Sequence, residues 1–195
     1  MKDRRPDSQD GADPVANPWT RLGRRTAYQN PWIVVYEDQV RRPDGKPGIY
    51  GVVHFRNRAI GVVAMDERDR VLLVGQYRYP LELYSWEIPE GGGAPEEEPV
   101  EAARRELLEE TGYSAGRWEE VLRAHLSNSV SDEEAVCFLA GDLRPGTARP
   151  EGTEQLQVRW VPFETALAMV DRGQITDALS VIGLQRVALL RLGRR

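Results

Sequence analysis

The chain is poor in cysteine and histidine and has no long apolar run. Its single cysteine, Cys137, excludes an internal disulfide framework, and its place in the run AVCFLA predicts a small buried hydrophobic residue. No apolar run approaches the roughly 18 residues that span a bilayer. Residues 1–18 also lack the apolar stretch of a secretory signal peptide. We therefore expect a cytoplasmic protein without a membrane partner.

Charge and motif content exclude further classes. The 31 acidic residues outnumber the 26 basic ones, and a net charge of −5 gives no reason to expect a nucleic-acid partner. The sequence has neither a GxxxxGK[ST] phosphate loop nor a paired CxxC zinc signature. His54 and His125 have no partners at a spacing that indicates a metal or nucleophilic site. With 195 residues, 41% of them hydrophobic, the chain is long enough for one domain with a real core.

What the sequence has in excess is negative charge between residues 91 and 113. Seven of the fifteen residues from 96 to 110 are glutamates. On a helix, Glu106 and Glu110 share a face with Glu109 beside them, and like charges at this spacing repel. They also lie in the last turn before Gly112, where the helix dipole disfavours anions. The pattern predicts a bound cation, and a divalent ion with oxygen ligands is the simplest candidate.

The spacing within this segment resembles the Nudix box, G-x5-E-x7-R-E-U-x-E-E-x-G-U, where U is a bulky apolar residue. Every fixed position is matched, and Tyr113 in the last apolar place is the mildest departure. The matching polar and glycine positions are Gly91, Glu97, Arg105, Glu106, Glu109, Glu110 and Gly112. By this resemblance the chain is identified as a member of the Nudix hydrolase family. The fold it implies is an α/β/α sandwich with a mixed β-sheet and an N-terminal antiparallel strand extension.

The resemblance also implies a role for each box residue. The cofactor would be Mg²⁺, with Mn²⁺ as the alternative. The implied ligands are the side chains of Glu106, Glu109 and Glu110 and the main-chain carbonyl of Glu90. We expect the Glu110 carboxylate to be exposed to the site. Glu97 and Arg105 would form an ion pair that orients the ligands, while Gly91 lets the backbone turn closely past them.

The implied reaction is hydrolysis of a diphosphate linked to another moiety, with a general base that takes a proton from water. The stretch SNSVSDEE at 127–134 resembles the S-x-G-x-S-D-E loop of ADP-ribose and ADP-sugar pyrophosphatases. Glu133 is therefore the first choice for the base and Glu134 the second. Glu109 is a further catalytic candidate within the box.

Two other stretches resemble the same branch of the family. VGQYRYP at 74–80 is similar to its Q-Y-R strand end, and WEIPEGG at 86–92 is similar to its W-E-L-P-A-G motif. The candidates for substrate binding are Arg78, Arg58, Glu87 and Trp32. A guanidinium such as that of Arg78 binds phosphates bidentately, and Trp32 is available to stack on a nucleobase. In this branch the amino-terminal strands commonly help to build the partner subunit's pocket, so a homodimer is implied.

Along the chain we expect a disordered tail at residues 1–16, an N-terminal strand region at 17–58 and the Nudix hydrolase domain at 59–195. Short apolar runs bounded by turn residues predict the strands. The expected strands are 32–40, 49–55, 60–65, 71–77, 118–124, 135–140 and 155–161. A glycine-rich loop leads to a helix that starts near Pro99 and stops at Gly112, and two more helices are expected at 162–171 and 176–192.

The leading hypothesis is a Mg²⁺-dependent pyrophosphohydrolase that cleaves a nucleoside diphosphate sugar into a nucleoside monophosphate and a sugar phosphate. ADP-ribose is the first substrate to test. One alternative is the same chemistry on GDP-mannose, a dinucleoside compound or a capped RNA. Another is a Nudix module that binds a nucleotide without cleaving it. The complete set of charged box residues favours hydrolysis over binding alone.

Overall fold

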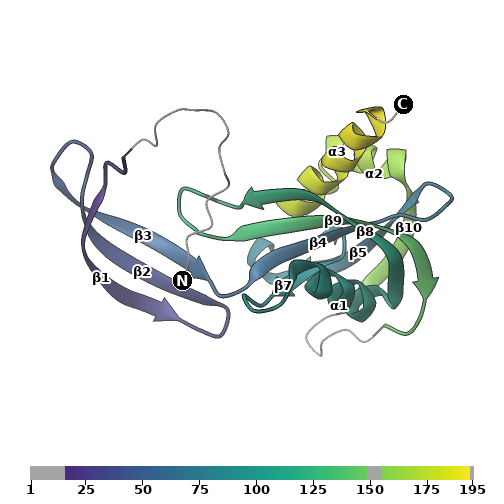
Figure 1. Ribbon diagram of the computed structural model, residues 1–195, viewed down its shortest axis with the longest axis horizontal. Helices are drawn as coiled ribbons and strands as arrows, with labels where there is room; N and C mark the ends of the chain where they lie inside the picture. Colours follow the sequence, from purple (N-terminus) through teal and green to yellow (C-terminus); the bar gives the residue numbers. More distant parts are fainter. Residues whose placement is uncertain (1–15, 149–154, 194–195) are drawn as a thin grey trace.

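The amino-terminal part of the fold is a three-stranded antiparallel sheet. The structure is a computed structural model that describes residues 16–148 and 155–193, so residues 1–15 of the expected tail lie outside the described residues. Strands β1 (Thr20–Gln29), β2 (Ile33–Arg41) and β3 (Pro47–Phe55) follow one another across this sheet. Figure 1 shows the sheet at one end of the molecule, beside the main body.

The body holds two more sheets. One is a mixed sheet in the order β7-β4-β9-β8, in which β4 and β9 run parallel. Its strands are β7 (Glu90–Gly93), β4 (Arg58–Ala64), β9 (Glu134–Pro145) and β8 (Tyr113–His125). The other is an antiparallel sheet of β10 (Gln157–Pro162), β5 (Arg70–Arg78) and β6 (Leu83–Glu87), and a short 3-10 helix, η1 (Tyr79–Leu81), joins β5 to β6.

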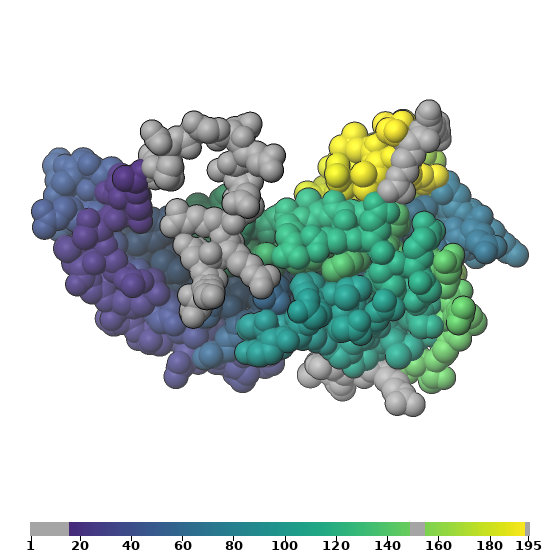
Figure 2. Space-filling model, in the orientation of Figure 1, coloured from purple at the N-terminus to yellow at the C-terminus, as the bar shows by residue number. Residues whose placement is uncertain are grey.

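Helices cover both faces of the mixed sheet. Along β4 the side chains alternate, so Ile60 packs in one core with Leu107 of α1 (Pro99–Thr111) while Val63 packs in a second core with Leu184 of α3 (Ala178–Gly193). Figure 1 shows α1 on one side of the sheet, and α3 with α2 (Phe163–Asp171) on the other. In Figure 2 the N-terminal sheet, purple to blue, forms one end of the molecule. The yellow α3 lies at the top of the molecule, toward the opposite end. The expected α/β/α sandwich is confirmed.

Most of the differences from expectation concern strands without an apolar pattern. All ten residues of β1 are exposed, so the strand has no alternating apolar face to mark it in the sequence. Strand β7 is only four residues long and reads EGGG, and glycine is depleted in strands. For this reason the segment was expected to be a loop, but in the structure it pairs with β4. Strand β6 was also missed, whereas the predicted burial of Cys137 is confirmed.

Candidate active site

Helix α1 presents the box glutamates at its carboxyl-terminal end. The helix begins at Pro99, and Gly112 ends it with a φ of 75° and an N–H that donates to the Leu108 carbonyl at 2.9 Å. Both helix ends are as predicted. The exposure expected for Glu110 was wrong, because this residue is only 3% exposed. Helix α1 packs against β7 and β8, and the carboxylate of Glu110 lies against the backbone of β7.

Arg105 connects the glutamates of the box to one another. Its Nε and Nη2 atoms lie 3.3 and 3.2 Å from the two carboxylate oxygens of Glu97. Its Nη1 atom lies 2.6 Å from Glu106 Oε1 and 3.1 Å from Glu109 Oε2. Nη2 also donates to the Gly92 carbonyl oxygen at 2.7 Å, which ties the helix to β7. The hydrogen bonds to Arg105 lower the pKa of Glu97.

The carboxylates of α1 lie directly on the backbone of β7. A Cβ atom at Gly91 would overlap the carboxylate of Glu106, so only glycine leaves room for this approach. One residue earlier, the N–H of Glu90 donates to Oε2 of Glu110 at 3.0 Å. Two neighbouring backbone positions of β7 therefore receive two carboxylates from the same helix face.

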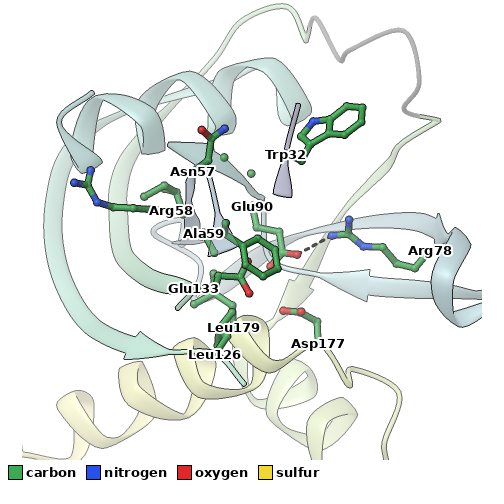
Figure 3. A pocket seen from close by; sticks show the side chains of 14 residues that line it. Trp32, Asn57, Arg58, Ala59, Arg78, Glu90, Leu126, Glu133, Asp177 and Leu179 are labelled. Atoms are coloured by element: carbon green, nitrogen blue, oxygen red, sulfur yellow. Dashed lines mark hydrogen bonds and ion pairs between the residues drawn. The ribbon is translucent and has the colours of Figure 1, made fainter. Parts of the chain in front are cut away.

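A pocket of about 410 Å³ opens beside β7. Its lining combines the polar residues Asn57, Arg58, Arg78, Glu90, Glu133 and Asp177 with the apolar residues Trp32, Phe55, Ala59, Ile60, Leu126 and Leu179. Figure 3 shows Glu90, Glu133 and Asp177 around the middle of the pocket, with Trp32 and Leu179 on opposite sides. A second pocket of about 350 Å³ lies along the box and shares Trp32, Asn57, Gly91 and Gly92 with the first. The box and the larger pocket are thus adjoining parts of one site.

Arg78 is held by two carboxylates at the wall of this pocket. Its Nε atom lies 2.9 Å from Glu87 Oε1, and its Nη2 atom contacts Glu87 Oε2 and lies 2.7 Å from Glu90 Oε1. Burial lowers the pKa of Arg78, but the two carboxylates outweigh this effect and raise it. Glu87, a candidate for substrate contact, is 2% exposed and serves as the partner of Arg78. Arg78 thus reaches the pocket already ion-paired.

The pocket contains an acidic group that the sequence did not reveal. Burial and the nearby Asp177 and Glu87 raise the pKa of the Glu90 side chain well above its usual range. Asp177 was missed because it precedes a helix and accepts the N–H of Ser180 at 2.7 Å, so its sequence context is that of an ordinary N-cap. Glu90 did leave a signal, since it stands where the resembling W-E-L-P-A-G motif has alanine.

The structure separates the two candidates for the general base. Glu133 lines the pocket, and burial, followed by the charges of Asp177 and Asp132, raises its pKa. Glu134 is the first residue of β9, and its carboxylate lies 3.3 Å from Arg58 Nε and 3.2 Å from Arg123 Nη1. Arg58 therefore lines the pocket as the partner of Glu134. Of the two acids, only Glu133 is a pocket residue.

Trp32 stands at the junction of the two pockets with 69% of its surface exposed. It follows the turn that joins β1 to β2, where its N–H donates to Asn30 Oδ1 at 2.9 Å. Its carbonyl accepts the N–H of Arg56 at 2.9 Å, just after β3. The indole is thus fixed at its backbone and exposed at its ring.

Residues 16–148 and 155–193 contain neither a three-residue metal cluster nor a membrane-spanning helix. No three side chains of histidine, cysteine, aspartate or glutamate in these ranges are grouped so as to hold a metal ion by themselves. No helix there is long and apolar enough to cross a membrane.

Comparison with known families decides the assignment. The NUDIX domain model matches residues 55–179, which is more than half of the chain. The chain belongs to the NUDIX domain family. A second model, the nucleoside diphosphate sugar hydrolase N-terminal domain, matches residues 19–53 and so covers most of the first sheet. The predictions of a Nudix hydrolase and of its diphosphate-sugar branch are confirmed.

Individual relatives agree with this assignment. An ADP-ribose pyrophosphatase of Mycobacterium tuberculosis is 31% identical over 180 residues, covering 88% of this chain and 84% of that protein. A CMP-5'-(N-acetyl-N-hydroxy-3-aminopropyl)phosphonate hydrolase of Streptomyces rubellomurinus is 30% identical over 177 residues, covering 90% of this chain and 84% of that protein. The crystal structure of an ADP compounds hydrolase superposes with a TM-score of 0.82 at 22% identity, covering 90% of this chain and 95% of that one, which shows the shared fold.

Proposed function

We propose that this Nudix hydrolase is a divalent-cation-dependent pyrophosphohydrolase of nucleoside diphosphate sugars, with ADP-ribose the first substrate to test. Its products are a nucleoside monophosphate and a sugar phosphate. The observation that carries the proposal is that Glu97, Glu106 and Glu109 of the box line one pocket, while Glu133 lines a second pocket that shares walls with the first. The match of residues 19–53 to the N-terminal domain of diphosphate-sugar hydrolases supports this substrate class.

The residues of the box fit a divalent cation such as Mg²⁺ or Mn²⁺. The potential ligand atoms of the box are all oxygens, which suits such a cation. Because Gly91 has no side chain, the Glu106 carboxylate occupies the space that a Cβ atom would fill. Glu106 and Glu110 would hold the ion with the main-chain carbonyl of Glu90, and Glu109 lies beside them. When bound, the cation neutralises the diphosphate and lowers the pKa of a coordinated water. Mg²⁺ commonly takes only one or two carboxylates and completes its shell with waters and substrate phosphates.

The other residues of the site prepare and orient the reactants. Glu133 takes the proton of the attacking water, and its raised pKa brings it closer to neutrality, where a general base works best. Arg105 and Glu97 hold the box glutamates in place. The exposed ring of Trp32 stacks on the nucleobase at the mouth of the pocket.

We also infer that the active form is a homodimer built through the N-terminal sheet. Strand β1 is an edge strand with all ten residues exposed, and an uncovered edge is a ready surface for pairing with a second chain. Light scattering of the purified protein measures its mass, and a monomer at micromolar concentration would contradict this inference.

A substrate panel with two glutamate variants tests the proposed function. The protein is incubated with Mg²⁺ and ADP-ribose, UDP-glucose, GDP-mannose, a CMP-linked compound or a dinucleoside polyphosphate, and released nucleoside monophosphate is measured. We expect release from at least one sugar nucleotide. Glu133→Gln should lower kcat by about 100-fold or more, while Glu134→Gln should keep kcat within about threefold of wild type because Glu134 lies outside the pocket. Release from none of these compounds, with binding still detected by calorimetry, would favour a non-catalytic binding module.

A further inference from the structure

The loop that carries Glu133 is attached to the N-terminal sheet. This loop, residues 126–133, joins β8 to β9. The N–H of Val53 on β3 donates to the Val130 carbonyl at 2.8 Å, and the N–H of Asp132 donates to the Val53 carbonyl at 3.3 Å. The loop therefore adds a short parallel bridge to the edge of the sheet.

Side chains reinforce this attachment at the residue next to Glu133. Oδ1 of Asp132 accepts the N–H of Phe55 at 3.0 Å, and Oδ2 lies 2.6 Å from Nδ1 of His54. Further out, the hydroxyl of Tyr50 donates to the Ser129 carbonyl at 2.6 Å. A single carboxylate thus connects the loop to two successive residues of β3.

The loop is closed at its base by its own bonds. The Leu126 N–H donates to the Glu133 carbonyl at 3.0 Å, and the Ser131 hydroxyl donates to the Leu126 carbonyl at 2.7 Å. These contacts fix the two ends of the loop relative to each other. They do not fix the loop relative to β3, whose Phe55 lines the same pocket as Glu133. That second constraint comes from the main-chain bonds of Val53, the Tyr50 hydroxyl and the Asp132 carboxylate, and the Asp132 carboxylate is the side-chain contact that lies next to Glu133.

We propose that Asp132 is a positioning residue that holds Glu133 toward the pocket by binding the end of β3. The inference rests on the proposed function, in which Glu133 is the general base. Asp132 immediately precedes Glu133, so a shift of its backbone moves the catalytic carboxylate by a similar amount. A misplacement of about 1 Å is enough to lower a rate by as much as 100-fold. The N-terminal sheet thereby acts on the reaction from within the same subunit.

The test compares two aspartates with similar local contacts. Asp44 also accepts a main-chain N–H, that of Lys46 at 3.1 Å, and pairs with the nearby Arg42, but it lies in the turn that joins β2 to β3. Asp132→Ala should lower kcat by about 10- to 100-fold with KM within about threefold, and Asp44→Ala should leave both unchanged. Asp132→Asn keeps an acceptor for the Phe55 N–H and should recover kcat to within about threefold of wild type.

A double-mutant cycle separates positioning from a general structural effect. If Asp132 acts through Glu133, Asp132→Ala should cause no further loss of rate in the Glu133→Gln background. An equal loss in both backgrounds would overturn the proposal, as would an Asp132→Ala enzyme with wild-type kcat. A poorly active Asp132→Asn variant would also overturn it, because the charge of Asp132 would then matter more than its contacts.

Hydrogen exchange gives a readout that needs no substrate. Asp132→Ala should speed amide exchange in residues 126–133, and Asp44→Ala should not. Unchanged exchange in Asp132→Ala overturns the proposal whatever the enzyme hydrolyses. If the wild type releases no product from any sugar nucleotide, the proposed function fails, and the exchange result still decides whether Asp132 holds the loop.

Discussion

Two arginines gather the carboxylates of this site, and they do so in different surroundings. Arg105 lies on the open face of α1 and contacts three glutamates that surround the second pocket. Arg78 lies at the end of β5 and contacts Glu87, whose side chain is 3% exposed. In the proposed function the first arrangement positions groups for a ligand, whereas the second neutralises a charge that the fold has buried. The same residue type therefore serves orientation at one place and stability at the other.

The ion pairs of the pocket arginines bear on how the proposed diphosphate substrate would be bound. Both arginines that line the larger pocket, Arg58 and Arg78, are already paired with glutamates. A guanidinium that binds phosphate through the N–H groups already used would first have to leave its carboxylate, which costs free energy at a partly buried site. A divalent cation on the box glutamates supplies the positive charge without this cost, which is a further argument for the proposed cofactor.

The largest effect should follow from removing a box carboxylate. Glu106→Gln keeps the size of the side chain but removes its charge, so it should lower kcat by roughly 100- to 1,000-fold because several kcal/mol of charge stabilisation are lost. Steady-state kinetics at saturating Mg²⁺ measure the change. Glu101→Gln is the matched control, since Glu101 is an exposed acid of the same helix. Equal rates for the two variants would show that the box does not hold the ion.

The sequence revealed the Arg105 group because its contacts are local. Helical spacing places Glu109 one turn after Arg105, Glu106 is the sequence neighbour of Arg105, and the glycine that ends the helix fixes its last turn. Glu97 lies only eight residues before Arg105. The motif therefore contained both the residues and most of the geometry that joins them.

The Arg78 group depends on tertiary structure that no local pattern encodes. Arg78 meets Glu87 from the neighbouring strand β5, although the register places Leu83 opposite Arg78 and Val74 opposite Glu87, so no pairing rule predicts the contact. Asp177 reaches Glu90 from the segment before α3, far along the chain. The strands follow the same contrast between local and tertiary signals. Strands with apolar runs were predicted, whereas β1 and β7, which depend on pairing with neighbouring strands, were not.

Replacing each arginine by glutamine should separate their effects on stability and on rate. Arg78→Gln leaves the carboxylate of Glu87 buried without its cation, so the free energy of unfolding should fall by about 3 kcal/mol. Arg105→Gln breaks contacts with more exposed carboxylates and should cost about 1 kcal/mol or less, although it should lower kcat strongly. Urea denaturation of both variants measures the difference. An equal loss of stability in the two variants would remove the distinction between them.

The smallest effect concerns the pH dependence of the brace between Glu97 and Arg105. Because Arg105 lowers the pKa of Glu97 in the folded state, the pair stabilises the fold above the unfolded pKa of about 4.3. This stabilisation is lost as the pH falls through the lowered folded pKa.

Glu97→Gln should therefore reduce the melting temperature at pH 7 by a few degrees at most, and the difference from wild type should shrink toward pH 3. Thermal melting from pH 3 to 7 without added metal measures this, with the exposed neighbour variant Glu96→Gln as control. A difference that grows as the pH falls would mean that Glu97 is stabilised in its protonated form, and the brace would then have to be assigned to the contacts of Arg105 with Glu106 and the Gly92 carbonyl.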